Sequence, residues 1–391
     1  MSRYEPAYYG PFSGMPASGT LVSSCAFTEG YPDKLCDIIA DSILDACLAD
    51  NSDCRVNCKV TMTTDRVALH GGMDAGIEVD PEAIARNVMQ QYGRNRTDKT
   101  VCIANGIEAL PKGRPPDSDE TALYPAYPEN GGIVSGFATD ETRSLLPLPL
   151  TLARAITQRL SAERGRPSPV GYATATVQYE DDRPCALKAV QVSLVTEGRD
   201  ANEQEAWIRD AVIPVALGKW MHKGVAVTVN PSGTASGDPI RAQYGGSRSL
   251  NASETYGGAG RHKGDPVSGM DPSRIIRSGS YYCRHVARRI VQLGLARQVE
   301  VYCVYNHRSL YHQDLAVNAF GTGNDAAVLD FIKQHFAFDT MSIAQHIGLC
   351  DGTIRYADTA RFGHFGQPVF PWETPDEPAG ADQQASTREN H

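Results

Sequence analysis

Residues 29–34, with the sequence EGYPDK, bring an acid, a tyrosine and a lysine together in one short turn. Pro32 suits the first position of a helix, where its missing N–H costs nothing. Asp33 then lies where a helix N-terminus favours negative charge, and Lys34 adds a cation in the same place. These two charges could serve a site at the helix start; alternatively, Asp33 could act only as a capping acid.

A second candidate is the glycine-rich stretch 258–264, which contains Arg261, His262 and Lys263. Backbone N–H groups and three side-chain donors could hold an anion there, and a solvated basic turn is the alternative. The glycine spacing resembles a dinucleotide-binding fingerprint, but no predicted strand directly precedes it and Pro266 follows closely. We therefore exclude a dinucleotide fingerprint.

Apolar periodicity predicts the elements that would position these residues. A stripe at three- and four-residue steps predicts a helix that begins at Pro32; its members are Leu35, Ile38, Ile39, Ile43, Ala46 and Cys47. Alternation over 173–179 and 187–195, joined by 180–184, predicts a β-hairpin. Long loops are expected over 111–132 and 230–280. This mixed order favours an α+β fold, with helices on one face of antiparallel sheets and a site shared between domains.

Composition narrows the classes of protein. The chain has 391 residues and a formal net charge of −9, so it lacks the basic balance of a nucleic-acid-binding protein. No apolar run approaches the length of about 18 residues that a membrane span needs, and residues 1–20 lack the pattern of a signal peptide. Ten cysteines without metal-binding spacing are typical of reduced, packed thiols. We therefore predict a cytoplasmic protein that binds neither nucleic acid nor membrane.

Several short motifs, taken in order, resemble those of the methionine adenosyltransferases, also called S-adenosylmethionine synthetases. Residues 29–34 are similar to that family's EGHPDK, and residues 136–142 (GFATDET) to its GYAT-(N/D)-ET. Further on, NPSG at 230–233, YGGAGRH at 256–262, SGMDPS at 268–273, FGHFG at 362–366 and FPWE at 370–373 resemble NPTG, YGG-x-x-RH, SGKDPS, YGHFG and FPWE. The order and spacing hold from about residue 23 to 375.

The resemblance implies the S-adenosylmethionine synthetase fold, with three similar α/β domains about a pseudo-threefold axis. We expect a flexible extension over 1–22, a central domain from 23–115 plus 235–275, a long active-site loop over 116–142, a second domain over 143–234, a third over 276–373 and a frayed tail over 374–391. The resemblance also implies a homodimer with active sites at the subunit interface. Whether two dimers form a tetramer stays open.

In the family, methionine sulfur attacks C5′ of ATP and the triphosphate leaves, against a basic wall with magnesium and potassium. By alignment, Asp33 would hold a metal or orient a donor, and Lys34, Arg261 and Arg274 would hold anions. Tyr31 and Tyr172 would line the pocket, and Asn130 would contact the amino-acid end. The expected substrate-binding set also includes Glu29, Arg248, His262, Lys263 and Asp271. Magnesium is compatible with Asp33, whereas potassium is not expected, because Lys59 takes the place of an acid that helps to hold it.

Departures from the family pattern remove much of the phosphate-binding wall. The family's phosphate-binding His is Tyr31, two of its lysines are Met270 and Tyr172, and its Arg-Lys pair falls on Ser249 and Leu250. Other changed positions are Met73, Asn130, Ala235 and Ile276. At roughly 1.5–3 kcal/mol per charge-assisted hydrogen bond, the lost cations would remove on the order of 7–15 kcal/mol from a developing polyphosphate charge. That loss corresponds to about five or more decades in rate.

Three functional hypotheses follow from these matches and departures. The first is a divergent enzyme of this fold that acts on an adenosyl substrate, at its 5′ carbon or at a sulfonium. Tyr31 and Tyr172 in former cation positions favour this reading, because aromatic rings suit a sulfonium. The second is an ordinary synthetase whose phosphate contacts have moved to Lys59, Lys263 or Arg248. The third is an inactive nucleoside-binding or regulatory homologue.

Overall fold

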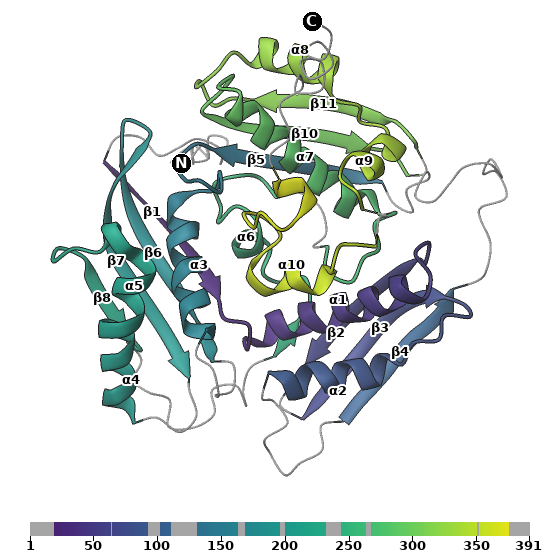
Figure 1. Ribbon diagram of the computed structural model, residues 1–391, viewed down its shortest axis with the longest axis horizontal. Helices are drawn as coiled ribbons and strands as arrows, with labels where there is room; N and C mark the ends of the chain where they lie inside the picture. The colour runs from purple at the N-terminus through teal and green to yellow at the C-terminus, as the bar shows by residue number, and fades with distance from the viewer. Residues whose placement is uncertain are drawn as a thin grey trace, which may run out of the picture.

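The computed structural model describes residues 19–63, 65–92, 102–110, 131–162, 169–195, 200–231, 244–262, 267–307, 309–349 and 352–374. In this part of the chain, three β-sheets stand apart from one another, each with helices on one side (Figure 1). Figure 1 shows α6 (Asn251–Glu254) and α10 (Tyr356–Phe362) in the centre, between the three sheets. The mixed helix and sheet content agrees with the predicted α+β fold.

The first sheet, here called sheet A, has the strand order β1-β6-β7-β8. Its strands are β1 (Thr20–Phe27), β6 (Val170–Glu180), β7 (Arg183–Val195) and β8 (Ala226–Val229). Its helical cover is α3 (Leu148–Ser161), α4 (Ala201–Trp207), a π-helical turn (Ile208–Val212), α5 (Ile213–Leu217) and a 3-10 turn (Gly218–Trp220). The predicted hairpin joins β6 to β7 through Asp181 and Asp182, whose φ values of 48° and 58° suit a tight two-residue turn.

The second sheet, sheet B, has the order β4-β3-β2-β9. Its strands are β4 (Cys102–Leu110), β3 (Arg66–Asp74), β2 (Val56–Met62) and the two-residue β9 (Gly245–Gly246). It is covered by α1 (Pro32–Asp50) and α2 (Pro81–Gln91). The predicted helix is confirmed, since α1 begins at Pro32 and buries Leu35, Ile39 and Ile43 completely.

The third sheet, sheet C, has the order β11-β10-β5. Its strands are β11 (His312–Asn318), β10 (Gln298–Tyr305) and β5 (Gly132–Thr139). Helix α7 (Ile275–Gln292) packs on β5 and β10, α9 (Thr340–His346) packs on α7, and α8 (Asp325–His335) lies beside β11. A short 3-10 turn, Pro371–Glu373, ends the described chain next to α7. The approach of α7 is close, because a Cβ on Gly136 would lie 2.0 Å from the Cys283 carbonyl carbon.

Three expectations from the sequence need correction. Residues 132–139, placed in a long active-site loop, form strand β5, which pairs with β10 and buries Val134 and Phe137. Residues 20–22, placed in the flexible extension, begin β1, which joins the sheet of the second domain rather than that of the central one. The loop expected over 230–280 contains α6 and the start of α7.

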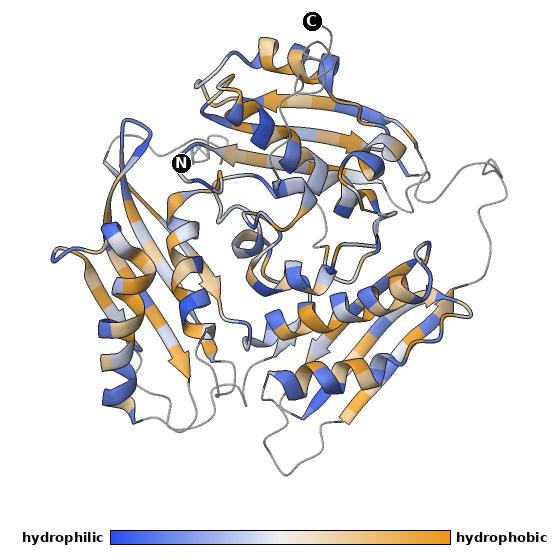
Figure 2. Ribbon diagram, viewed as in Figure 1, coloured by the Kyte–Doolittle hydropathy of each residue, from blue (hydrophilic) through white to orange (hydrophobic). Residues whose placement is uncertain are grey.

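The sheets are mainly antiparallel, as expected, but β3 pairs with β4 and β7 with β8 in parallel. Figure 2 shows apolar residues concentrated along β10 and β11 and polar ones on the outlying helices α2 and α4. None of the helices in the described ranges is both long enough and apolar enough to cross a membrane.

Candidate active site

The turn before α1 carries the first candidate residues. Tyr31 is the N-cap residue of α1, and Pro32 takes the first helical position. Asp33 does not cap its own helix; its Oδ1 accepts a hydrogen bond of 2.7 Å from the backbone N–H of Gly246 in β9. Burial raises the pKa of Asp33, and the bond from Gly246 lowers it. Asp33 therefore joins the start of α1 to a distant strand, and its side chain is only partly buried.

Lys34 makes a buried ion pair. Its Nζ lies 2.7 Å from Oε2 of Glu254 in α6, and the two side chains are 1% and 9% exposed. A buried ammonium needs such a partner, because desolvation of an unpaired charge is costly. Lys34 was expected to hold a substrate anion, but in this structure Glu254 neutralises it.

Arg248 is also committed to protein partners. Its guanidinium donates to the backbone oxygens of Ser268 and Cys58 and to the side chain of Asn57. Its backbone N–H donates to Oδ1 of Asp37, 2.7 Å away. Burial lowers the pKa of Arg248 to about 10 and raises that of Asp37 to about 8. Arg248 thus ties β2 to the glycine-rich segment after α6.

Two further candidates, Arg261 and Arg274, face acids. The Nε of Arg261 lies 2.6 Å from Oε2 of Glu300, which is fully buried in β10. The Nε of Arg274 lies 3.7 Å from Oδ2 of Asp271. Asp271 itself is fully buried and accepts from the backbone of Val56 and from Ser273. Asp271 therefore organises the loop before α7, and each of the candidate cations described so far has a partner in the protein.

Glu29 is buried and bonds to Arg361 in α10, with Oε1 to Nε at 2.5 Å. Helix α10 packs along α1, and its N-terminal N–H groups, those of Tyr356 and Ala357, donate to the carboxylate of Asp45. Both ends of α10 are therefore fastened to α1 or to the turn before it. Neither Arg361 nor Asp45 stands out in the sequence.

Tyr31 and Tyr172 lie near the same aromatic residue. The ring of Phe27, at the end of β1, is 4.6 Å from the ring of Tyr31 and 5.9 Å from that of Tyr172, between centroids. We call Phe27, Tyr31 and Tyr172 the aromatic strip. Burial raises the pKa of Tyr31, and the charge of Asp33 raises it further. The strip and Asp33 are therefore parts of one site.

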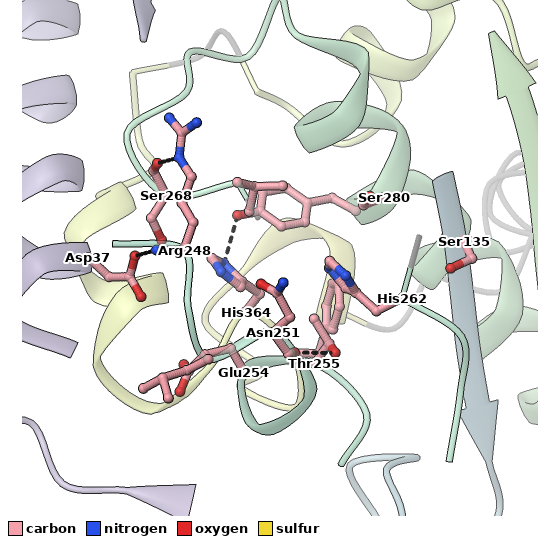
Figure 3. A pocket seen from close by; sticks show the side chains of 14 residues that line it. Asp37, Ser135, Arg248, Asn251, Glu254, Thr255, His262, Ser268, Ser280 and His364 are labelled. Carbon is pink, nitrogen blue, oxygen red and sulfur yellow. Dashed lines mark hydrogen bonds between the residues drawn. The ribbon is translucent and has the colours of Figure 1, made fainter. Parts of the chain in front are cut away.

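A small cavity lies behind this site, at the centre of the molecule. It is lined by residues of α1, α6 and α7 and of the segment that follows α10, among them Asp37, Glu254 and His364. Figure 3 shows the amide of Asn251 between the rings of His364 and His262. Burial lowers the pKa of both histidines, so both are neutral at neutral pH. With a volume of ≈ 20 Å³ the cavity has room for water but not for a nucleoside.

A larger hollow of ≈ 330 Å³ lies at the other end of α1, between Leu48 and the segment around Ile354. None of the candidate residues lines it. Among the residues that the structure describes, no cluster of three or more His, Cys, Asp or Glu side chains is placed to hold a metal. The carboxylate of Asp33 is half-buried, and a magnesium ion can be held by one or two carboxylates with water as its other ligands. Lys59 is exposed on β2.

Comparison with known proteins decides the family. The family models for the N-terminal, central and C-terminal domains of S-adenosylmethionine synthetase match residues 19–108, 128–235 and 245–374. This chain belongs to the S-adenosylmethionine synthetase family. The S-adenosylmethionine synthase of Thermus thermophilus is 34% identical over 382 residues, covering 91% of this chain and 96% of that one. The synthase of Parafrankia sp. (strain EAN1pec) is 34% identical over 384 residues, covering 90% and 96%.

Membership of this family confirms the resemblance seen in the motifs, but it does not test the individual site residues. Asn130 and Lys263 lie outside the described residues. The structure brings Tyr31, Asp33 and Tyr172 to one site, with Lys34 and Glu29 beside them but turned to protein partners. Sequence reasoning missed Phe27, which looks like an ordinary strand residue, and Glu254, which no local pattern connects to Lys34.

Proposed function

We propose that this chain makes or breaks the bond between the 5′ carbon of an adenosyl group and a sulfur atom. Its membership of the S-adenosylmethionine synthetase family over all three domains carries the proposal. The adenosyl ligand would lie at the start of α1, against the aromatic strip and Asp33. We further propose that the chain works as a homodimer, as the family resemblance implies.

In the proposed reaction, a sulfur atom attacks C5′ and the leaving group departs with the bonding electron pair. In the opposite direction, a phosphate oxygen attacks C5′ of a sulfonium and the sulfur leaves as a neutral thioether. Asp33 would orient the ligand through its carboxylate, or hold a magnesium ion together with the ligand's phosphates. Magnesium, when bound, would supply positive charge to a leaving phosphate oxygen. The aromatic strip would exclude water from one side of the sulfur centre. Lys34 could serve a phosphate only if the ligand displaced Glu254.

The proposed reaction can run in two directions, towards formation or towards cleavage of the bond between C5′ and sulfur. The names of the relatives favour synthesis of S-adenosylmethionine; the family resemblance implies ATP and methionine as the reactants. The pairing of Lys34, Arg248, Arg261 and Arg274 with protein groups favours a ligand that carries less negative charge, such as S-adenosylmethionine itself. Binding without turnover would identify the chain as a regulatory homologue.

Product analysis tests the proposal. The purified full-length chain is incubated with ATP, methionine and magnesium, and in parallel with S-adenosylmethionine, inorganic tripolyphosphate and magnesium. Chromatography with mass spectrometry follows the adenosyl products, and a phosphate assay follows the leaving group. Conversion in either mixture, lost in Asp33→Asn, supports the proposal. If no adenosyl compound binds or reacts under either condition, the proposal is wrong.

A further inference from the structure

The aromatic strip has a defined geometry. Phe27 and Tyr172 are direct partners across the β1–β6 pair, and Tyr31 follows at the start of α1. The planes of Tyr31 and Tyr172 are each tilted against that of Phe27, by 49° and 47°. The three rings therefore make one continuous aromatic surface that runs from the sheet onto the helix start.

This surface lies on the face of sheet A that α3 does not cover. Along β1 and β6, alternate side chains point to opposite faces. Ala26 and Ala173 are buried in the cluster that contains the α3 residues, so Phe27 and Tyr172 face the other way. Phe27, Tyr31 and Tyr172 are all only partly buried. Each of these residues therefore keeps part of its surface exposed, on the side of sheet A away from α3.

Among the residues that the structure describes, the charges that act on the strip are negative or neutralised. Asp33 is close enough to Tyr31 to raise its pKa, and Glu254 acts in the same way on the thiol of Cys25, which lies on the same strand as Phe27. Lys34, the neighbouring cation, is neutralised by Glu254. Because Glu254 is paired with Lys34, Asp33 is the acid that acts on the strip, and an aromatic surface beside a carboxylate attracts a cation and repels a phosphate.

Building on the proposed function, we infer that the aromatic strip selects its adenosyl ligand by the positive charge on sulfur, and so binds a sulfonium rather than a thioether. A sulfonium over an aromatic face gains the cation–π attraction, with Asp33 adding Coulomb attraction. A neutral thioether of the same shape gains only apolar contact. Specificity for the charged sulfur would thus depend on Tyr31, Phe27 and Tyr172.

Calorimetry with two nearly identical ligands tests this inference. S-adenosylmethionine carries a methylated, positively charged sulfur, and S-adenosylhomocysteine is its neutral thioether. We expect the full-length protein to bind the sulfonium at least about tenfold more tightly, as one or two favourable cation–π contacts would give. Choline, a cation without adenosine, is the third probe, and we expect it to bind at least about a hundredfold more weakly than S-adenosylmethionine.

Variants assign the preference to the strip. Tyr31→Leu and Tyr172→Leu keep an apolar side chain but remove the ring, so each should lower the sulfonium-to-thioether ratio by about 2- to 25-fold. Tyr31→Phe keeps the ring and should keep the ratio. Tyr311→Leu, at a tyrosine that is 67% exposed in the β10–β11 connection, is the matched control and should leave the ratio unchanged. Thermal melting checks that each variant is folded.

The outcomes separate this inference from the proposed function. Equal affinity for the two adenosyl ligands would overturn the inference while leaving the adenosyl chemistry intact. Choline binding as tight as that of S-adenosylmethionine would also overturn it, because the adenosine would then not matter. If neither adenosyl ligand bound and neither incubation gave a product, the proposed function itself would fail, and the inference with it.

Discussion

Removal of the charge on Glu254 should both destabilise the protein and change what it binds. Glu254→Gln leaves the ammonium of Lys34, which is 1% exposed, without its counter-ion at 2.7 Å. Breaking a buried ion pair in this way costs about 3–5 kcal/mol. Because domains are typically stable by about 5–15 kcal/mol, the loss should be large but compatible with a folded protein.

Urea unfolding followed by circular dichroism measures the first effect. The surface variant Glu82→Gln is the matched control, since Glu82 pairs with Arg86 at 2.6 Å but both side chains are 42% exposed. An exposed pair contributes about 0–1 kcal/mol, so this variant should unfold almost like the wild type. The double variant Lys34→Met/Glu254→Leu removes both charges and should recover much of the stability lost in Glu254→Gln.

Binding of inorganic tripolyphosphate measures the second effect. In Glu254→Gln the Lys34 ammonium has no acid partner, so its affinity for an added polyanion should rise, by roughly tenfold for one charge-assisted hydrogen bond. Calorimetry at fixed ionic strength compares the two proteins. The reasoning about Lys34 is refuted if Glu254→Gln is as stable as Glu82→Gln, or if its tripolyphosphate affinity is unchanged.

Three shorter predictions concern pH, the C-terminal segment and core packing. Burial raises the pKa of Asp37 to about 8, so the folded protein binds a proton at this carboxyl group more tightly than the unfolded chain does. The protonated carboxyl group therefore adds its full contribution to the free energy of unfolding below about pH 4, and this contribution is lost as the pH rises through about 8. Asp37→Asn should therefore flatten the fall in urea midpoint between about pH 4 and 8. Glu373→Gln should cost about 3–5 kcal/mol, because it leaves the fully buried Arg284 without its carboxylate. Gly136→Ala should lower the melting temperature by several degrees or prevent folding, because its Cβ would collide with Cys283.

Each of these three predictions would be contradicted by a specific result. If the urea midpoint of Asp37→Asn falls with pH as steeply as that of the wild type, Asp37 does not cause the pH dependence of stability. A Glu373→Gln protein with wild-type stability would mean that Arg284 relies on its backbone partners alone. For Gly136, the control is Gly294→Ala, which has open space at its Cβ position and only a φ of 71° to strain it. Equal melting of the two glycine variants would contradict the packing argument.

Local pattern predicted the parts of the fold that have a strong period. Helix α1 is confirmed because its apolar stripe repeats over several turns, and the β6–β7 hairpin because two alternating runs flank a turn. The sequence predicts loop where strand β5 forms, because Gly132 and Gly136 interrupt its apolar pattern; the space at these glycines is filled by Ile276 and Cys283 of α7. Helix α10 has only seven residues, too few to show a period.

The candidate site was only partly accessible to sequence reasoning. The motif at residues 29–34 marks the turn and its charges, but not which partner each charge takes. Glu254 lies 220 positions from Lys34, and Gly246 lies 213 positions from Asp33. Such pairings depend on tertiary contacts that no local propensity encodes. Phe27 belongs to the candidate site because β1 pairs with β6, which places Phe27 opposite Tyr172.

Each of the three sheets includes one strand that is distant in sequence from the other strands of that sheet. Sheet A takes β1 from the N-terminal family region, sheet C takes β5 from the central one, and sheet B takes β9 from the C-terminal one. During synthesis, β1 leaves the ribosome long before β6 exists, and sheet B waits for β9. The nascent chain must therefore carry unpaired strand edges until most of the sequence has been made, which favours slow folding and dependence on chaperones.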